Sequence, residues 1–271
     1  MYGAIVGDTV GSIYEWNNIK TKRFPLFQEN CAPTDDSFMT IAVARACMYY
    51  RESEERDLNS FRERLVQEMH RIGERYPDKG YGGNFRNWLL AKDHEPYGSF
   101  GNGSAMRVSP CGWICDTLEE TEALAEASAD VTHNHPEGIK GAKATAAAIY
   151  LARTGHLRSE IGEYIQEHYY PLEDTLWEIR ADYAYDTTCQ GTVPQAIEAF
   201  VESFSFEDAI RNAISLGGDS DTLAAITGSI AEAYYGVPEK IRADVRKFLH
   251  RDMHSDEIES IERFHKSCVT K

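Results

Sequence analysis

Apolar residues recur at helical spacing along most of the chain, so the sequence predicts a protein built from α-helices. Three clear examples are residues 38–49, 58–72 and 118–131, where large apolar side chains fall three or four positions apart. Sustained alternation of apolar and polar residues, which would indicate half-buried strands, is nearly absent. The expected fold class is therefore all-α.

Four further segments combine helical spacing with many Ala, Ser and Gly residues. They are residues 141–154, 193–203, 206–215 and 221–236. Small side chains allow helix axes to approach closely, which suits a compact globule of many crossing helices. We expect these segments to form the tightly packed interior.

A single domain spanning residues 1–271 is the simplest organisation. The loops rich in Gly, Asn, Pro and His, at 73–84, 93–104 and 132–138, are short and separate helices of the same character. The polar tail, residues 239–271, is expected to form one or two peripheral helices. Its expected inward face consists of Phe248, Leu249, Ile258, Ile261 and Phe264.

The charge balance limits the partners that the protein can have. Lys and Arg total 28 against 44 Asp and Glu, a net charge of −16, and no basic cluster extends over more than a few positions. This charge balance argues against a nucleic-acid surface, because such surfaces depend on a positive footprint. An anionic substrate would have to be held by helix N-termini, glycine-rich backbone or bound cations.

The cysteines and the N-terminus predict a cytoplasmic protein without a membrane segment. The six cysteines form no CxxC pair and follow no disulfide-like spacing, so we expect free thiols in a reducing compartment. The chain start lacks a basic region followed by a long apolar run, and no apolar run approaches about 18 residues.

Two segments place clusters of oxygen-bearing side chains directly before apolar helices. One is Thr34, Asp35 and Asp36, and the other is Asp219, Asp221 and Thr222. Helix capping is the simpler explanation of either segment alone, but a cap needs one side chain and each segment supplies three. If the two helix starts faced each other, four carboxylates and two hydroxyls would share a small volume. Such crowding requires cations, and hard ions such as Mg²⁺ or Mn²⁺ prefer these ligands.

The N-terminal stretch "GAIVGDTVGSIYEWN" is predicted to be an apolar helix. Gly3, Gly7 and Gly11 recur at every fourth position and would give it a smooth face for close packing. Asp8 and Glu15 lie seven positions apart, on nearly one face of such a helix. From the residues alone, Asp8 is as consistent with a buried hydrogen bond as with a role in supporting the ligand residues. For Glu15 the residues alone favour a solvated position on the surface.

A glycine-rich loop and a histidine-rich turn add candidate ligand contacts. In "YGSFGNGSAMRVSP" three glycines alternate with Ser and Asn, and such loops can hold phosphate oxygens on backbone N–H groups, although no P-loop or dinucleotide motif is present. In "THNHPEG", His133 and His135 lack further ligands at zinc-site spacing. A polar turn or a substrate contact is favoured for this pair.

Together these motifs resemble the ADP-ribosylglycohydrolase family. Five occur in the family's order: "GDTVGSIYEW", "TDDSFMT", "GNGSAMRVSP", "THNHPEGIKGA" and "SLGGDSDTLAAITGSIAEAYYG". They cover about residues 2–238. The resemblance implies an all-α globule of orthogonally packed helices, with a binuclear metal cleft that holds two Mg²⁺ or Mn²⁺ ions.

The resemblance also implies a role for each matching residue. The metal ligands would be Thr34, Asp35, Asp36, Asp219, Asp221 and Thr222. One of Glu15, Asp35 and Asp36 would accept a proton from the attacking water. The substrate would contact Glu15, Gly101, Asn102, Gly103, Ser104, Met106, His133 and Gly191. The stretch Cys189-Gln190-Gly191 departs from the Ser-Gly-Tyr pattern of many relatives, so the resemblance leaves the adenosine contacts and the acceptor preference open.

The implied activity is hydrolysis of the glycosidic bond at C1″ of an ADP-ribosyl group, which releases ADP-ribose. The partner would be an ADP-ribosylated protein or a small conjugate such as an O-acyl-ADP-ribose. Three alternatives remain: a non-catalytic ADP-ribose-binding protein, a structural crystallin-type protein, and a metal-dependent phosphohydrolase that acts on the diphosphate. The sequence leaves open the acceptor, the choice between Mg²⁺ and Mn²⁺, the general base and the oligomeric state.

Overall fold

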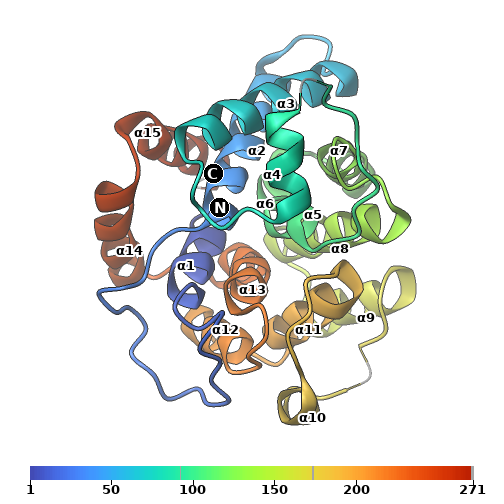
Figure 1. Ribbon diagram of the computed structural model, residues 1–271. Helices are drawn as coiled ribbons and strands as arrows, with labels where there is room; N and C mark the ends of the chain where they lie inside the picture. Colours follow the sequence, from blue (N-terminus) through green and yellow to red (C-terminus); the bar gives the residue numbers. More distant parts are fainter. Residues whose placement is uncertain (92, 173, 270–271) are drawn as a thin grey trace.

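The computed structural model describes residues 1–91, 93–172 and 174–269, which form helices joined mostly by short loops (Figure 1). The helices are α1 (Tyr2–Gly11), α2 (Asp35–Glu52), α3 (Leu58–Arg75), α4 (Gly83–Leu90), α5 (Gly103–Met106), α6 (Ser109–Ile114), α7 (Leu118–Asp130), α8 (Pro136–Arg153), α9 (Arg158–His168), α10 (Leu176–Asp182), α11 (Cys189–Val201), α12 (Phe206–Ile214), α13 (Ser220–Tyr235), α14 (Glu239–Asp252) and α15 (Ser255–Phe264).

The all-α prediction is confirmed. The described residues contain no β-strand, only an isolated antiparallel bridge between Gly101 and Thr188. The helices run in several directions and form one domain rather than a parallel bundle (Figure 1). The segments expected from apolar spacing correspond to α2, α3, α7, α8, α11, α12 and α13.

The most extensive helix contact joins α1 to α13, two helices from opposite ends of the chain. Their backbones touch because glycines face each other or face small residues. A Cβ atom on Gly7 would lie 1.9 Å from the carbonyl oxygen of Ala224, and one on Gly3 would lie 2.0 Å from that of Gly228. The close packing expected from the glycine spacing is therefore confirmed, and α13 is identified as its partner.

Helix α13 lies at the centre of the molecule. Every residue from Ser220 to Glu232 is buried, and α1, α8, α11 and α12 pack around the helix. A helix enclosed on all sides must be apolar or small-residue all round, which explains its composition. Its N-terminus, with the adjoining acidic residues, consequently lies deep in the protein.

The C-terminal helices α14 and α15 lie at the edge of the molecule, next to α1 and α2 (Figure 1). Leu249, Ile261 and Phe264 are fully buried there, as predicted. Phe248 and Ile258 are half-buried; Ile258 packs against the core, and the ring of Phe248 stacks on that of Phe27. A π-helical turn, His265–Val269, follows α15.

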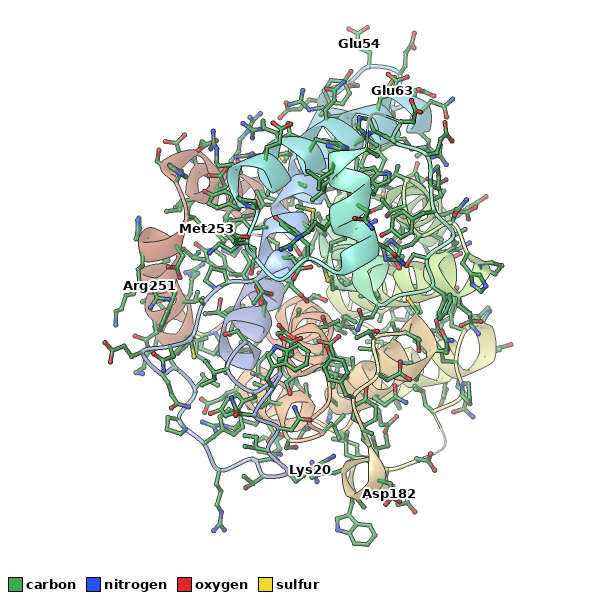
Figure 2. All side chains as sticks on the ribbon, viewed as in Figure 1. Lys20, Glu54, Glu63, Asp182, Arg251 and Met253 are labelled. Atoms are coloured by element: carbon green, nitrogen blue, oxygen red, sulfur yellow. The ribbon has the colours of Figure 1, made fainter. Side chains whose placement is uncertain are left out.

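Charged side chains cover the outside, as Figure 2 shows for Lys20, Glu54, Glu63, Asp182 and Arg251. All six cysteines are free thiols, and five of them are buried. None of the helices in the described part of the chain is both long and apolar enough to cross a membrane.

Candidate metal centre and substrate cavity

Asp8 of α1 fixes the start of α2. Thr34 is in an extended conformation immediately before α2, so the first N–H groups of the helix need external acceptors. The Asp8 carboxylate accepts hydrogen bonds from the backbone N–H groups of Thr34 (2.9 Å) and Ser37 (3.1 Å), and also from both hydroxyls. Asp8 thus makes the buried hydrogen bonds that were one of its two possibilities, and it holds Asp35 and Asp36 in place.

Two glycines set the direction of the chain where it enters α13. Gly217 and Gly218 have φ of 72° and 68°, in the left-handed region that favours glycine. The side chain of Asn18 forms hydrogen bonds with both backbone polar groups of Gly218, at 2.8 and 2.9 Å. The turn that follows α1 and the loop before α13 are therefore tied together.

Glu15 does not lie on the N-terminal helix, so this part of the prediction is wrong. Helix α1 ends at Gly11, and the chain turns so that the Asn18 amide donates to the carbonyl oxygens of Tyr14 and Glu15. The same amide also donates a hydrogen bond to the carbonyl oxygen of Gly218, 200 residues away in the sequence. This tertiary contact therefore fixes the position of the turn. The turn brings the Glu15 carboxylate to Asp219, and the hydroxyl of Tyr185 donates to it at 3.1 Å.

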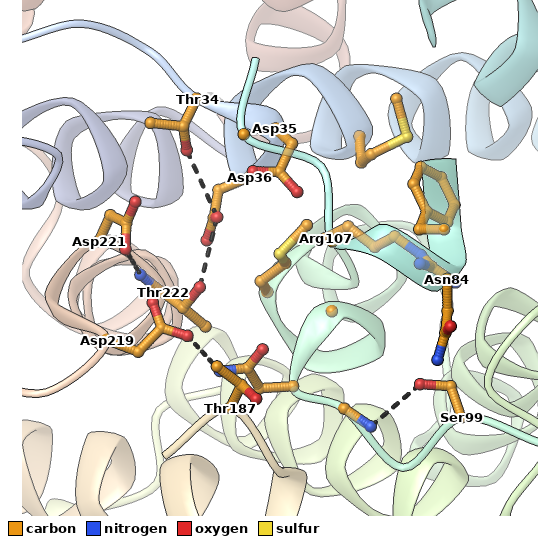
Figure 3. A pocket seen from close by; sticks show the side chains of 18 of the residues that line it. Thr34, Asp35, Asp36, Asn84, Ser99, Arg107, Thr187, Asp219, Asp221 and Thr222 are labelled. Carbon is orange, nitrogen blue, oxygen red and sulfur yellow. Dashed lines mark hydrogen bonds between the residues drawn. The ribbon is translucent and has the colours of Figure 1, made fainter. Parts of the chain in front are cut away.

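The two helix starts face each other across a gap, as Figure 3 shows. Carboxylate oxygens of Asp8, Asp36 and Asp221 lie within 4.8 Å of one another, and so do those of Glu15, Asp219 and Asp221. The hydroxyl of Thr222 donates to Asp36 at 3.3 Å across the gap. Asp221 therefore belongs to both groups and connects them.

The carboxylates of the two clusters lie close together. Among the described residues, no basic side chain forms an ion pair with any of them, and Oδ1 of Asp36 is buried without a hydrogen-bond partner. Burial, then neighbouring carboxylates, raise the pKa of Asp36, Asp35 and Asp221 well above the usual range. Burial also raises the pKa of Asp8 to about 6.

This ligand set fits hard divalent cations. Carboxylate and hydroxyl oxygens are the ligands that Mg²⁺ and Mn²⁺ prefer, and the unpartnered oxygen of Asp36 is an available ligand atom. Cations between the carboxylates would also remove the repulsion that raises their pKa values. The two clusters of three carboxylates, which have Asp221 in common, are compatible with two neighbouring ions.

A cavity of about 330 Å³ opens beside the carboxylates. All six of the expected metal ligands line it. The expected substrate contacts that line it are Glu15, Gly101, Asn102, Gly103, Met106 and His133. The volume is within the usual range for small-molecule sites, about 300–1,000 Å³.

Two expected substrate contacts lie behind the cavity wall. The Ser104 hydroxyl donates to the carbonyl oxygen of Gly138 at 2.7 Å, which fixes the glycine-rich loop to α8. Gly191 lies beneath Asp186, whose carboxylate would be 2.1 Å from a Cβ atom at that position. These two residues shape the wall rather than line the cavity.

Asn102 connects the glycine-rich loop to the acidic cluster. Its side-chain amide donates to Asp219 at 2.8 Å and to Thr192 at 3.1 Å. Its backbone N–H donates to the carbonyl oxygen of Thr187 at 2.8 Å. The loop, the start of α11 and the start of α13 are thereby held in one arrangement.

The histidine-rich turn contributes differently at its two histidines. His133 is buried and lines the cavity next to Gly103. His135 is exposed, and its Nδ1 accepts a hydrogen bond from the backbone N–H of Glu137 at the start of α8. His135 therefore has the polar-turn role, and His133 lies where a ligand contact is possible.

Several lining residues were not predicted. They are Met39, Gly80, Gly82, Gly83, Asn84, Phe85, Tyr97, Ser99, Arg107, Tyr185 and Thr187. Arg107 had a detectable signal, because it is a lone cation in an otherwise apolar and small-residue stretch. Asn84, Tyr185 and Thr187 lie in segments whose sequences carry no motif, and only the fold brings them to the cavity.

The fold and the site define an all-helical protein in which two helix starts present a buried acidic cluster to a substrate-sized cavity. The chain belongs to the ADP-ribosylglycohydrolase family, whose sequence profile matches residues 1–270.

Curated relatives span most of the chain. It is 26% identical to "ADP-ribosylhydrolase ARH3" of Mus musculus, over 93% of this chain and 87% of that protein. It is also 26% identical to "ADP-ribosylarginine hydrolase Tri1" of Serratia proteamaculans, over 87% of this chain and 70% of that protein. A solved structure of an "ADP-ribosylglycohydrolase-related protein complex" has the same fold, with a TM-score of 0.66, 23% identity, and coverage of 97% and 93%.

Proposed function

We propose that this protein is a metal-dependent hydrolase that cleaves the glycosidic bond at C1″ of an ADP-ribosyl group and releases ADP-ribose. One observation carries the proposal. Two clusters of three carboxylates share Asp221 and lie directly beside a cavity walled by the glycine-rich loop; all of these carboxylates are buried except the half-buried Glu15. Asn102 of the loop donates a hydrogen bond to Asp219 and so links the loop to the clusters. Membership of the family supports the same substrate class.

The cavity suits the parts of an ADP-ribosyl group. Gly101 and Gly103 give part of the wall no side chains, so a diphosphate can approach the backbone closely. His133 adds a ring nitrogen on the same side. The carboxylates lie beside this wall, where the distal ribose and its C1″ atom would be placed.

Thr34, Asp35, Asp36, Asp219, Asp221 and Thr222 would hold two cations, Mg²⁺ or Mn²⁺. When bound, such ions supply Lewis-acid polarisation and charge compensation. They also explain how an acidic protein binds an acidic ligand, because the positive charge is local.

The chain's own carboxylates provide proton acceptors. Water attacks C1″ as the bond to the acceptor breaks, through a transition state with oxocarbenium character. Glu15, Asp35 or Asp36 takes a proton from that water, and the acceptor leaves with the electron pair of the broken bond and takes up a proton from solvent. Burial is the largest cause of the raised pKa of Glu15, ahead of the repulsion from Asp219 that bound cations would remove. A higher pKa makes a carboxylate a stronger base near neutral pH. The Tyr185 hydroxyl orients the Glu15 carboxylate.

The acceptor is best identified with a panel of ADP-ribosyl conjugates of different linkage: arginine, serine and O-acyl. Each is incubated with the protein and with Mg²⁺, Mn²⁺ or Zn²⁺, and the product is identified by mass spectrometry. We expect intact ADP-ribose from at least one conjugate with Mg²⁺ or Mn²⁺, and loss of activity with excess EDTA. Cleavage within the diphosphate would support a phosphohydrolase instead, and activity with Zn²⁺ alone would contradict the proposed centre.

A non-catalytic ADP-ribose-binding or structural role is the second candidate. The complete set of ligands argues against it, since such a protein does not need every carboxylate of the centre. Binding of ADP-ribose by calorimetry, without turnover of any conjugate, would favour it. We also propose a cytoplasmic location, which the six free cysteines support.

A further inference from the structure

Arg107 is a buried cation that has no anionic partner in the described part of the chain. Its side chain is 1% exposed, and its Nη2 donates to the carbonyl oxygen of Ser128 (3.1 Å) and to the hydroxyl of Thr132 (2.8 Å). Burial lowers its pKa to about 10, so it is still protonated at neutral pH. A guanidinium only donates hydrogen bonds, and the Thr132 oxygen is therefore an acceptor in this contact.

The hydroxyl proton of Thr132 must then go to another acceptor, because the side chain is fully buried. Among the described residues, the acceptor within hydrogen-bonding distance is Nδ1 of His133, at 2.8 Å. Donation to Nδ1 requires an unprotonated Nδ1, and a neutral imidazole then carries its hydrogen on Nε2. The direction of each bond from Arg107 to His133 is thereby determined.

The opposite nitrogen of His133 faces the cavity. Its Nε2 lies 3.1 Å from the position of a Cβ on Gly103 and 3.6 Å from that of a Cβ on Gly101. The glycines leave space for the ring, since a side chain at position 103 would press against it. Burial, and next the cationic Arg107, hold the pKa of His133 well below its usual value, which keeps the ring neutral.

We propose that Arg107 and Thr132 form a buried hydrogen-bond relay that fixes His133 in its Nε2–H form, so that one N–H donor faces the cavity. Such a donor selects an anionic oxygen over another donor. If the proposed function is correct, on which the identity of this ligand rests, the oxygen belongs to the diphosphate. Thr132 is then a positioning residue that acts through His133, and Arg107, which also lines the cavity, orients the Thr132 hydroxyl.

The relay is tested by NMR of the intact protein with ¹⁵N-labelled histidine. Long-range ¹H–¹⁵N correlations distinguish the two neutral tautomers and the imidazolium, and His133→Gln identifies the His133 signals among the nine histidines. We expect the Nε2–H form in the wild-type protein. An Nδ1–H form or an imidazolium in the wild-type protein overturns the proposal.

Two variants separate the relay from simple packing. Thr132→Val keeps the shape but removes the hydroxyl, so the tautomer preference should be lost and ADP-ribose affinity should fall about tenfold, as for one lost hydrogen bond to an anion. Thr132→Ser keeps the hydroxyl and should restore both. Circular dichroism checks that each variant is folded. An unchanged tautomer in Thr132→Val would contradict the relay.

The ligand is tested separately. ADP-ribose and ADP should shift the His133 Nε2 resonance, whereas adenosine, which lacks phosphate, should not; a shift with adenosine alone overturns the assignment of an anionic oxygen.

Failure of the relay and failure of the proposed function are distinguishable. If His133 has the Nε2–H form in a protein that hydrolyses no conjugate, the relay is supported and the proposed function is contradicted. If the protein is active and His133 has another tautomer, the function is supported and the relay is contradicted.

Discussion

Asp8 shows how a buried carboxylate acts as both support and candidate ligand. It accepts hydrogen bonds from the backbone and side chains of Thr34 and Ser37, and one of its oxygens lies within 4.8 Å of Asp36 and Asp221. The residue that positions the Thr34–Asp36 segment is thus part of the same acidic cluster. A substitution at Asp8 would alter the helix start and the cluster together, whereas Asp221 has a simpler environment.

Asp221→Asn is therefore the sharpest test of the acidic cluster. Asp221 belongs to both carboxylate groups, and the amide lacks the charge that divalent cations require. We expect release of ADP-ribose to fall by at least about 100-fold and Mn²⁺ affinity to fall with it, at unchanged helicity. Turnover and isothermal titration with Mn²⁺ measure the two effects.

Glu63→Gln is the matched control, because Glu63 is exposed on α3, away from the site, and loses the same charge. It should leave both quantities unchanged. Full activity in Asp221→Asn would contradict the assignment of the metal centre.

At this scale the sequence predicted the acids but not their neighbours. Three oxygen-bearing side chains at a helix start are visible in a motif such as Thr34–Asp36. Arg107 contributes through a hydrogen bond to Thr132, and Tyr185 through one to Glu15. Both are tertiary contacts, which no local sequence pattern encodes. Glu15 itself was predicted for the site through resemblance, although its helical placement was wrong.

At the scale of elements, the contact between α1 and α13 determines the geometry of the site, because Asp8 is on one helix and Asp221 on the other. Glycine at every fourth position predicted a close contact but could not identify the partner helix. Apolar spacing located the helices because burial of one face requires it. The short helices α4, α5 and α10 are too brief to produce a clear period.

Gly7→Ala should destabilise the protein by about 3 kcal/mol or more, since overpacking of this kind forces the two backbones apart. The added Cβ would lie 1.9 Å from the carbonyl oxygen of Ala224, and backbone cannot yield as a flexible side chain does. Urea denaturation monitored by circular dichroism gives the free energy of unfolding.

Gly83→Ala is the control, because a Cβ there meets no atom within 4 Å and the residue begins a helix. This variant should be neutral or stabilised by up to about 1 kcal/mol. Equal stability of Gly7→Ala and the wild type would show that the two helices are not in backbone contact.

At the scale of the whole molecule, the stability of the fold depends on protonation of the acidic cluster, and the proposed cation binding would be coupled to it. The pKa of Asp8 rises from 3.8 to about 6 on folding, and those of Asp36 and Asp221 also rise. Below about pH 4 these carboxyl groups are protonated in both the folded and the unfolded chain, so they do not reduce the free energy of unfolding. As the pH rises towards and through 6, the folded protein without cations retains protons that the unfolded chain releases, so the free energy of unfolding falls.

Mn²⁺ should therefore raise the melting temperature more at pH 8 than at pH 5.5, because protons compete with cations for the same carboxylates. At a concentration of about 100 times Kd we expect a rise of at least about 5 °C at pH 8. Differential scanning calorimetry with and without EDTA measures it, and Asp221→Asn should show little response. An equal rise at both pH values would contradict the coupling.

The pairing of α1 with α13 also has a consequence for biosynthesis. Gly7 and Ala224 are 217 positions apart, so at about 5–20 residues per second the first helix waits roughly 10 to 40 s for its partner to be translated. During that interval its apolar surface, which is fully buried in the finished protein, has no permanent cover. The nascent chain is then a natural client for ribosome-associated chaperones. A truncated product that ends before residue 219 would lack Asp219 and Asp221, two of the four carboxylates among the expected metal ligands. The proposed metal-dependent activity would accordingly require synthesis to continue past Thr222.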